Sequence, residues 1–406
     1  MSQSKGLLER LGPNDIDEFL LSSRESPDGI ELDVVEGEFW TASQRQGANL
    51  HEISYRACFK PQLPEFFISR FTGAGDLVYD PFAGRGTTAI EAALHGRNVA
   101  VNDVNPLTRY FTQPRLEFPS LNDVADRLSS IPRSSQAEAS IDLTMFYEER
   151  TLDELVALKT YLHERDQVGE DDAVDRWIRM AATNRLTGHS PGFFSVYSMP
   201  PNQAVSQSSQ IRINEKRQQV PSYRDTHALI LKKSRQLQKG ASAREIENLR
   251  AAAKEALFLC EDASATPSIM DSSVQLTVTS PPFLDVVQYS NDNWLRGWFN
   301  TIDMEEVAKK ITMAKTLEAW NEKMSAVFDE LFRVTKPNGY VAFEVGEVRN
   351  GKIKLEDAVV PVGIESGFRC LGVMLNTQEF SKTSNIWGIK NNSRGTNTNR
   401  IVLFQK

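Results

Sequence analysis

Short apolar segments separated by turn residues recur along the chain and predict buried strands. Residues 76–79, 98–103 and 274–278 each have the length and composition of a strand. Residues 316–331 and 138–164 instead read as helices, the latter with leucines spaced for one helix face. This alternation of strands and helices predicts an α/β fold with helices on both faces of its sheet.

Two prolines end the strand at residues 274–278 abruptly. Thr279, Ser280, Pro281, Pro282 and Phe283 follow it, and neither proline can donate to a sheet ladder. The turn presents a hydroxyl, backbone carbonyls and an aromatic face at the carboxyl edge of a sheet, where open α/β sheets bind ligands. Such a set suits a flat, amino-bearing ring. Taken alone, the same residues also fit an ordinary loop.

A glycine loop follows the strand at residues 76–79. It runs from Asp80 to Thr88, contains Gly84 and Gly86, and leads into the helix-like residues 89–94. A strand, a glycine loop and a helix in this order let the backbone approach a nucleotide-like cofactor closely. We expect Asp80 to orient the loop or to accept a hydrogen bond from a cofactor amine. A plain strand-to-helix turn is the alternative.

Two further acids stand at predicted strand ends. Asp103 lies 19 residues beyond Gly84, where dinucleotide-type folds place an acid on ribose hydroxyls. Asp262 closes an apolar segment that begins at Leu257, and its carboxylate is placed to accept from an adenine amine. A helix N-cap or a solvated turn acid is the alternative for each.

Together these segments resemble the DNA amino-methyltransferases that use S-adenosylmethionine. The glycine loop resembles the cofactor motif of that family, and Ser280 with the two prolines resembles its catalytic motif in the form associated with cytosine-N4 enzymes. Phe283 stands where tyrosine is more frequent, which keeps the stacking face. The resemblance covers residues 50–115 and 250–406. It implies a Rossmann-like methyltransferase sheet, S-adenosylmethionine as cofactor and double-stranded DNA as partner.

The resemblance also implies roles for individual residues. The Ser280 hydroxyl and the Pro281 carbonyl would accept the hydrogens of a cytosine amine, whose lone pair is otherwise conjugated with the ring. Because a base inside a duplex cannot reach the cofactor, it must first be flipped out. The catalytic candidates are Ser280, Pro281, Pro282 and Phe283. The cofactor-binding candidates are Phe59, Lys60, Asp80, Phe82, Ala83, Gly84, Gly86, Thr87, Thr88, Asp103, Asp262 and Ala263.

Residues just beyond the catalytic motif have two interpretations. Asp285 and Asp292 are close enough in sequence to assist the reaction, although surface helix acids are the favoured interpretation. Trp294 and Trp298 are candidates to line the base pocket, although a place in the core is favoured.

The order of the motifs divides the chain into three parts. Residues 1–50 form an N-terminal segment, which we interpret as a short amphipathic helix followed by an acidic connector. Residues 51–115 and 250–406 form the catalytic domain. Residues 116–249 interrupt this domain as a largely helical insertion.

Charge is distributed unevenly along the chain. The 406 residues carry a net charge of −8, yet residues 176–239 hold eleven lysines and arginines against two acids, a local charge of +9. Phosphate contact requires such a basic stretch, so the insertion is the candidate DNA-recognition region. A solvated helix face is the alternative. The candidates for phosphate contact are Arg212, Lys216, Arg217, Arg224, Lys232, Lys233 and Arg235.

Composition predicts an ordinary soluble protein, with 40% hydrophobic and 25% charged residues. No apolar run approaches the roughly 18 residues that a membrane span needs, and the N-terminus lacks the apolar core of a signal peptide. Three widely spaced cysteines predict reduced thiols in a cytoplasm and no metal site.

The favoured interpretation is a DNA cytosine-N4 methyltransferase. An adenine-N6 enzyme on the same scaffold, an RNA base methyltransferase and a catalytically silent DNA-binding protein are the alternatives. Intact Ser280, Gly84 and Gly86 argue against a silent protein. The sequence leaves open the recognition site, the oligomeric state and whether a cognate restriction enzyme is a partner.

Overall fold

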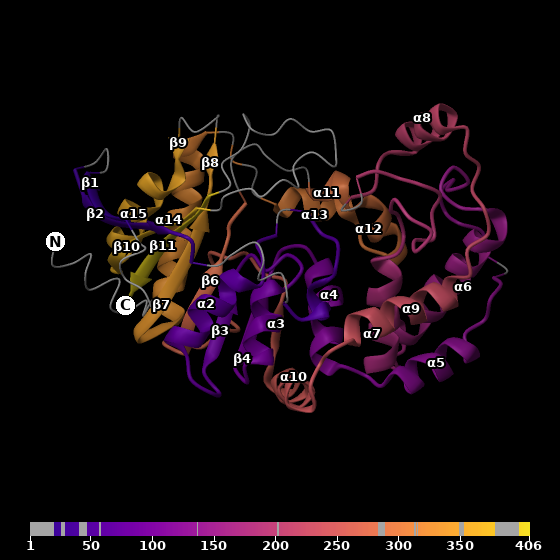
Figure 1. Ribbon diagram of the computed structural model, residues 1–406, viewed down its shortest axis with the longest axis horizontal. Helices are drawn as coiled ribbons and strands as arrows, with labels where there is room; N and C mark the ends of the chain where they lie inside the picture. The colour runs from indigo at the N-terminus through magenta and orange to yellow at the C-terminus, as the bar shows by residue number, and fades with distance from the viewer. Residues whose placement is uncertain are drawn as a thin grey trace.

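A nine-stranded sheet occupies one half of the molecule, and a group of helices occupies the other (Figure 1). The computed structural model describes residues 20–25, 29–39, 47–56, 58–135, 137–200, 203–282, 289–311, 314, 316–348, 353–377 and 398–406. The strands of the sheet are β1 (Leu20–Glu25), β2 (Glu31–Gly37), β3 (Leu77–Asp80), β4 (Asn98–Asn102), β5 (Leu257–Leu259), β6 (Val274–Thr279), β7 (Thr335–Val345), β10 (Arg369–Thr377) and β11 (Thr398–Gln405).

The strand order is β1-β2-β10-β11-β7-β6-β3-β4-β5. From β7 to β5 all strands are parallel, whereas β11 is antiparallel to both of its neighbours. The chain leaves β3 toward β4 on one side, and β6, on the other side of β3, leads toward β7. This is a topological switch point, beyond which open α/β sheets bind ligands. The predicted Rossmann-like α/β fold is confirmed.

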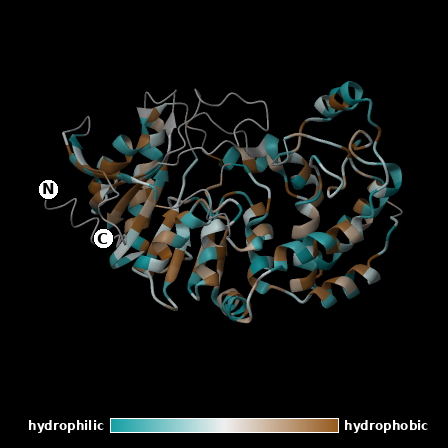
Figure 2. Ribbon diagram, in the orientation of Figure 1, coloured by the Kyte–Doolittle hydropathy of each residue, from teal (hydrophilic) through white to brown (hydrophobic). Residues whose placement is uncertain are grey.

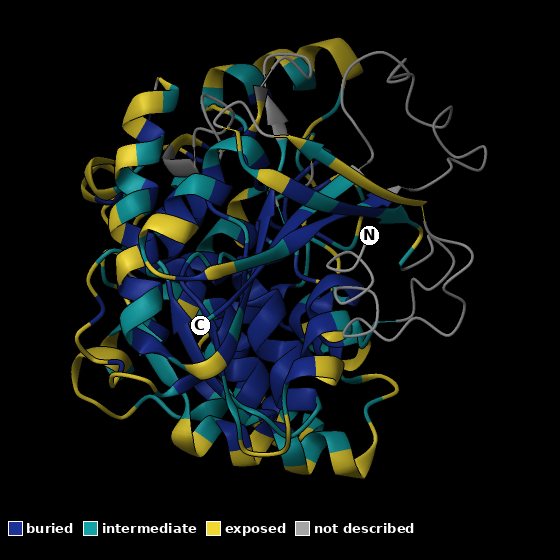
Figure 3. Cartoon of the chain, turned by 90° about the vertical axis from the view of Figure 1, so that its left-hand side faces the viewer, coloured by how far each residue is buried: buried dark blue, intermediate teal, exposed yellow. Residues whose placement is uncertain are grey.

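The sheet has helices on both faces. Face one carries α2 (Gln62–Phe71), α3 (Thr87–Leu94), α4 (Leu107–Glu117) and α10 (Ala243–Glu255), and face two carries α14 (Leu317–Val334) and α15 (Leu355–Glu365). Because neighbouring side chains of a strand point to opposite faces, Val78 and Tyr79 of β3 enter different cores. Figure 2 shows the strands as largely hydrophobic, and Figure 3 shows the central strands buried and the outer sides of the helices exposed.

The sequence located the central strands well, with one difference in β7. Residues 334–339, with Pro337, Asn338 and Gly339, have a sequence typical of a turn before a strand. In the structure, the pairing with β6 jumps from Thr335 to Tyr340, so the predicted turn is a bulge within a longer strand. A Cβ on Gly339 would lie 2.8 Å from Thr335 Cγ2, so the bulge requires a glycine there.

The N-terminal segment differs from its prediction. Instead of an acidic connector, β1 and β2 form a hairpin at the edge of the sheet, with β2 parallel to β10. Leu32, Val34 and Val35 of β2 are buried, which explains why this acidic stretch still forms a strand. The amphipathic helix expected around residues 7–11 lies outside the described residues.

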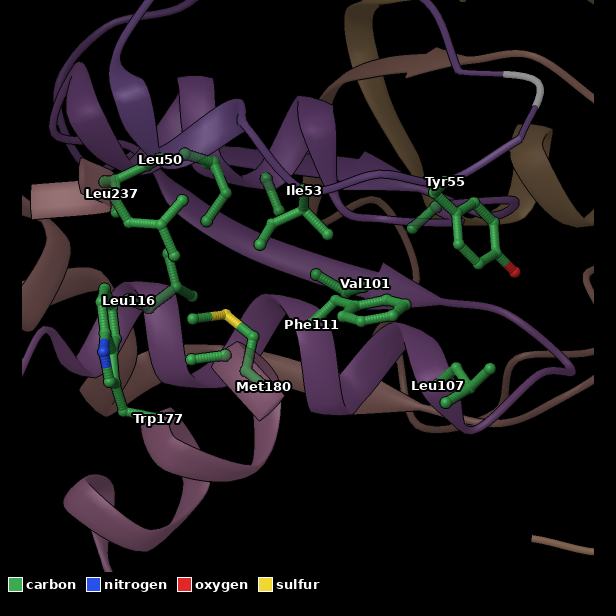
Figure 4. Packing of buried hydrophobic residues seen from close by; sticks show 14 of the residues in the cluster. Leu50, Ile53, Tyr55, Val101, Leu107, Phe111, Leu116, Trp177, Met180 and Leu237 are labelled. Atoms are coloured by element: carbon green, nitrogen blue, oxygen red, sulfur yellow. The ribbon is translucent and has the colours of Figure 1, made fainter. Parts of the chain in front are cut away.

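The largely helical insertion packs as part of the same core. Its helices are α5 (Leu121–Ser130), α6 (Glu149–Gln167), α7 (Ala173–Thr183), α8 (Gln207–Arg217) and α9 (Thr226–Gln238). Trp177 and Met180 of α7 and Leu237 of α9 join the cluster that contains Leu116 and Phe111 of α4 (Figure 4). The insertion is therefore anchored to the sheet through α4.

The helix expected at residues 138–164 begins later, at Glu149. Glu148 caps it by accepting from the backbone N–H of Thr151. Before the cap, Leu143, Phe146 and Tyr147 are buried in the core, which holds this stretch outside a helix.

Several short elements complete the described chain. They are the 3-10 helix η2 (Asn49–His51), helices α11 (Tyr289–Asp292), α12 (Trp294–Asn300) and α13 (Met304–Lys310), and the two-stranded pair β8 (Glu347–Val348) and β9 (Ile353–Lys354). In the described part of the chain, no helix combines the length and apolar character that crossing a membrane requires.

Candidate active site

A pocket opens at the switch point, beyond the carboxyl ends of β3, β4, β5 and β6. Its volume is about 900 Å³, part of it open to solvent. Ser280 and Pro282 from the catalytic motif line it together with Phe82 and Gly84 from the glycine loop. The remaining lining residues are Tyr55, Pro81, Asp103, Val104, Asn105, Glu261, Asp262, Ala263, Lys310, Ile311, Trp320, Lys323 and Met324. The fold therefore brings both predicted motifs to one pocket.

The glycine loop has a backbone that only glycine adopts easily. Gly84 and Gly86 have φ of 52° and 76°, in the left-handed region. Gly86 is also the N-cap of α3, and Thr108 Oγ1 donates to the Gly84 carbonyl over 2.7 Å. The loop is thus held in one shape, and Gly84 presents bare backbone to the pocket.

Replacing Gly86 with Ala is expected to lower the free energy of unfolding by about 2–4 kcal/mol, because strain and overpacking add. A Cβ there would lie 2.1 Å from Thr112 Oγ1. Gly75→Ala is the matched control, since Gly75 has φ of 80° with no heavy atom within 4 Å of the added Cβ. Urea unfolding measures both variants, and equal losses would show that the contact with Thr112 is unimportant.

Asp80 connects the two motifs rather than lining the pocket. Its Oδ1 accepts from Thr279 Oγ1 over 2.7 Å and from the backbone N–H of Phe82 over 3.2 Å. Burial raises the pKa of Asp80 to about 7, although these hydrogen bonds lower it. Of the two expected roles, the geometry favours orienting the loop, because Asp80 holds the glycine loop against the residue before Ser280.

Asp103 lines the pocket and supports the glycine loop. Its carboxylate accepts from the backbone N–H groups of Gly84 and Asn105, each over 2.9 Å. Burial raises the pKa of Asp103 despite these bonds. A carboxylate has about four acceptor sites, so two backbone bonds leave capacity for ribose hydroxyls.

Replacing Asp103 with Ala is expected to weaken S-adenosylmethionine binding by about 10- to 100-fold, the loss of one or two bonds to a charged acceptor. Calorimetric titration measures this affinity, and an unchanged value would rule out the ribose role. A cofactor analogue lacking both ribose hydroxyls is the control. If the role is correct, the analogue binds wild type and variant alike.

The end of β5 supplies a second pair of acids. The Asp262 carboxylate is bound by Lys323 Nζ over 2.6 and 2.8 Å and by Ser264 Oγ over 2.7 Å. Glu261, which the sequence did not single out, also lines the pocket. Its Oε1 accepts from Ser268 Oγ, whereas its Oε2 is buried without a hydrogen-bond partner among the described residues. That orphaned oxygen is suited to a donor on a bound ligand.

An aromatic residue holds the predicted catalytic motif in place through a hydrogen bond. Trp320 Nε1 donates to the Pro282 carbonyl over 3.0 Å, and the buried Trp320 side chain also lines the pocket. This bond occupies the Pro282 carbonyl and leaves Ser280 and Pro281 as the nearest acceptors of the motif. Phe283 and Asp285 lie outside the described residues.

A buried glutamate stands beside Ser280. Thr279 pairs with Phe343 on β7, which places Glu344 next to Ser280. The Asn399 amide of β11 donates to the Glu344 carboxylate. Glu344 is 7% exposed, and burial raises its pKa to about 7, although the Asn399 amide and the nearby Ser280 hydroxyl lower it. Glu344 was not identified from the sequence, although an acid within the otherwise apolar strand 340–345 is a pattern that could have indicated it.

The other cofactor candidates lie outside the pocket wall. Phe59 is half-buried and its carbonyl accepts from Arg85 over 3.4 Å, while Lys60 is exposed. Thr88 Oγ1 donates to the Val278 carbonyl of β6 over 3.0 Å, and Thr87 Oγ1 accepts from Arg85. Within the described chain, the site candidates that do not line the pocket are Phe59, Lys60, Asp80, Ala83, Gly86, Thr87, Thr88 and Pro281.

The aromatics and the acid beyond the motif have structural partners. Asp292 is buried and accepts from Arg56 Nη1 over 2.7 Å, so it is not a surface helix acid as favoured, nor does it line the pocket. Trp294 Nε1 donates to the Val205 carbonyl, and Trp298 Nε1 to Ser140 Oγ, each over 3.2 Å. These bonds fasten the helices after the motif to the insertion.

The seven basic candidates do not form one group. Lys233 is turned inward with a side chain 3% exposed, and Arg224 is half-buried. Helix α8 lies at the far end of the helical half from the sheet (Figure 1). The exposed members are Arg212, Lys216 and Arg217 on α8 and Lys232 and Arg235 on α9.

Comparison with known proteins agrees with one of the two motifs in this pocket, the glycine loop. Residues 21–110 match the family model described as DNA methylase. This match shows that residues 21–110 are similar to DNA methylases. The methylase-like segment includes the glycine loop and Asp103. A type II methyltransferase, M.MjaII of Methanocaldococcus jannaschii, is 35% identical over 63 residues, which are 16% of this chain and 12% of that protein. The chain thus matches about an eighth of that relative's length.

Solved structures add only distant likenesses. A protein of Thermus thermophilus described as a DNA modification methylase, solved with S-adenosyl-L-methionine, has a TM-score of 0.23 at 22% identity, over 36% of this chain and 53% of that one. The ribosomal RNA methyltransferase aviRa of Streptomyces viridochromogenes has a TM-score of 0.36 at 12% identity, over 91% and 94%.

Proposed function

We propose that this protein is a DNA methyltransferase that transfers a methyl group from S-adenosylmethionine to the N4 amine of a flipped cytosine. The observation that carries this proposal is the convergence of two motifs. Ser280 at the end of β6 and Gly84 after β3 line one pocket at the switch point of the sheet. A methyl donor held against the loop and an amine held at Ser280 would meet there.

The residues in the pocket fit S-adenosylmethionine. The cofactor, when bound, supplies an electrophilic methyl group on a sulfonium. Gly84 lets its backbone approach the ligand, and Asp103 has acceptor capacity for ribose hydroxyls. The orphaned Oε2 of Glu261 is a second acceptor for ribose or for an adenine amine. Each of these groups belongs to a different strand end, so together they surround one ligand.

Ser280 and Pro281 would prepare the target amine. By accepting its hydrogens, they draw them out of the plane of the base and free the lone pair for attack. Glu344 is placed beside Ser280, and a Ser280 hydroxyl that donates its proton to Glu344 would keep its lone pairs available for the substrate. Glu344 therefore acts as a positioning residue that makes Ser280 an acceptor. The product amine then loses its proton without a strong base.

DNA is the proposed substrate, and exposed cations of the insertion are the proposed contacts. Arg212, Lys216 and Arg217 on α8 and Lys232 and Arg235 on α9 face solvent, as phosphate contact requires. Extruding the target base costs a few kcal/mol, roughly, which these contacts would offset. Double-stranded DNA is therefore the partner that the charge distribution favours.

An adenine-N6 enzyme is the second candidate. The same pocket and the same acceptors suit the N6 amine of adenine, because both amines are conjugated and planar. Ser280 in place of an acid or amide favours cytosine through the family resemblance alone.

Transfer of a labelled methyl group tests the proposed activity. Tritiated S-adenosylmethionine is incubated with mixed-sequence duplex DNA, with structured RNA and without nucleic acid. We expect label in the DNA alone. Label in the RNA alone would replace DNA by RNA as substrate, and binding of the cofactor without any transfer would indicate a silent binding protein.

A further inference from the structure

A second pocket lies beside the active-site pocket and contains three cationic side chains. Its volume is about 670 Å³, largely open to solvent. Tyr55 lines both pockets, so they share a wall. The lining residues are Glu52, Ile53, Ser54, Tyr55, Arg85, Arg185, Lys233 and Gln236.

The three cations come from segments far apart in the sequence. Arg85 belongs to the glycine loop, Arg185 follows α7, and Lys233 lies on α9. Arg85 is held by the Ile53 carbonyl over 2.9 Å, and Lys233 Nζ donates to the Glu52 carbonyl over 2.7 Å. The fold brings these three positive charges together, because they are far apart in the sequence.

The position of Arg185 is also fixed. Its guanidinium lies 4.0 Å from the centre of the Phe193 ring and donates to Asn184 Oδ1 over 2.7 Å. Stacking on an aromatic face orients an arginine without neutralising it. The neutral amide of Asn184 does not neutralise it either.

Negative charge in this pocket does not balance the positive charge. Glu52 is the one carboxylate among the described lining residues, and its Oε2 lies 3.8 Å from Lys233 Nζ. Three cations and one anion leave a net charge of +2. Burial, together with the charge of Arg185, lowers the pKa of Lys233 to about 8. Like charges gathered in a half-buried pocket are costly unless an anion joins them.

We propose that this pocket binds a phosphate group, supplied by the backbone of the nucleic-acid substrate. Lys and Arg are the side chains that bind phosphate through charge-assisted hydrogen bonds. The wall shared through Tyr55 places such a phosphate next to the reacting base, where it would fix the strand. The assignment of this phosphate to a nucleic-acid backbone rests on the proposed function. The phosphate site itself does not.

This assignment gives Lys233 a different role from its neighbours on α9. Lys232 and Arg235 face solvent, whereas Lys233 points into the pocket. A phosphate would have to enter the pocket to meet Lys233. The contact would therefore hold one specific phosphate, while the exposed cations attract the duplex generally.

The test compares Lys233→Met with Lys254→Met, a matched loss of one charge on the exposed face of α10. Duplex binding is measured between 50 and 200 mM salt, roughly the range over which phosphate contacts are resolved. Lys233→Met should weaken binding about tenfold and reduce the slope of log K against log salt by about 0.9. Lys254→Met should leave both unchanged. Equal behaviour of the two variants overturns the backbone assignment.

A second arm distinguishes the source of the phosphate. Thermal unfolding of wild type is compared in inorganic phosphate and in sodium chloride at equal ionic strength. Stabilisation by phosphate that Lys233→Met abolishes supports the site. The same result with an unchanged salt slope identifies a free phosphate ligand and overturns the nucleic-acid source. No stabilisation and no change in slope overturn the site.

Arg185→Met serves as the second variant if Lys233→Met fails to fold. Duplex binding by the wild-type protein distinguishes failure of the proposed function from failure of the proposed phosphate pocket. Failure of wild type to bind any duplex contradicts the proposed function. Normal binding by wild type, with an unaltered slope in both pocket variants, contradicts the pocket alone.

Discussion

Replacing Ser280 with Ala is expected to lower kcat for DNA methylation by about 10²- to 10³-fold, the size of effect seen when one preorganised hydrogen-bonding group is lost from an active site. Ala removes the hydroxyl that, in the proposed mechanism, accepts a hydrogen bond from the target amine. Bisubstrate kinetics with labelled S-adenosylmethionine measure kcat. The KM for cofactor should change little, because the acceptors for ribose come from β4 and β5.

A matched control separates chemistry from folding. Ser264→Ala removes a hydroxyl from the end of β5, where it binds Asp262 rather than the reacting amine. We expect this variant to keep kcat within about threefold of wild type, since it leaves the transition-state contacts intact. Equal loss of cofactor binding and transfer in Ser280→Ala would remove the proposed role of Ser280.

Replacing Glu344 with Gln is expected to lower kcat by about 10²-fold, at the lower end of losses seen for positioned proton acceptors. A glutamine that accepts from Asn399 with its oxygen presents its NH₂ group to Ser280. That group donates to the hydroxyl and occupies the lone pair needed by the substrate. Steady-state kinetics at saturating cofactor and DNA measure the loss. A kcat equal to that of wild type would show that Glu344 is only structural.

The pH dependence of kcat gives an independent readout for Glu344. Its folded pKa of about 7 means that the carboxylate, the form that the proposed mechanism requires to accept the Ser280 proton, prevails above pH 7. Wild-type kcat should therefore fall about tenfold per pH unit below 7. Asp80 titrates in the same range, so the Glu344→Gln variant should lose most, but not all, of the fall in kcat below pH 7. An identical pH profile in wild type and variant contradicts the role.

The Glu344→Gln substitution should raise the stability of the folded state while it lowers activity. An acid whose folded pKa is raised binds its proton more tightly when folded, so the folded state loses stability as pH rises from about 4.5 to 7. Glu344→Gln removes this loss. The variant should therefore have a higher Tm than wild type at pH 8 while being nearly inactive, which is a pairing typical of functional buried charge.

Much of the site was predictable because its signals are local. The glycine loop requires left-handed backbone at Gly84 and Gly86. Two consecutive prolines end β6 at a defined point, because neither can donate to a sheet ladder. Asp103 and Asp262 stand at strand ends that short apolar runs reveal. These features need only neighbouring residues, so the sequence located five of the pocket-lining cofactor candidates: Phe82, Gly84, Asp103, Asp262 and Ala263.

The rest depends on contacts between distant segments. Glu344 meets Ser280 because β7 pairs with β6, and Glu261 meets the pocket because β5 pairs with β4. β2 forms a strand despite its acids because β10 covers its edge. The burial of Lys233 follows from the packing of α9 against η2. None of these pairings has a signature within a short window of sequence.

The most direct measurement is nucleoside mass spectrometry of duplex DNA methylated by the purified protein. We expect N4-methyldeoxycytidine from wild type, and about 100-fold less or lower still from Ser280→Ala. N6-methyldeoxyadenosine would keep the pocket and its acceptors but contradict the assigned base. Methylation of DNA by Ser280→Ala at the wild-type rate would contradict the mechanism itself.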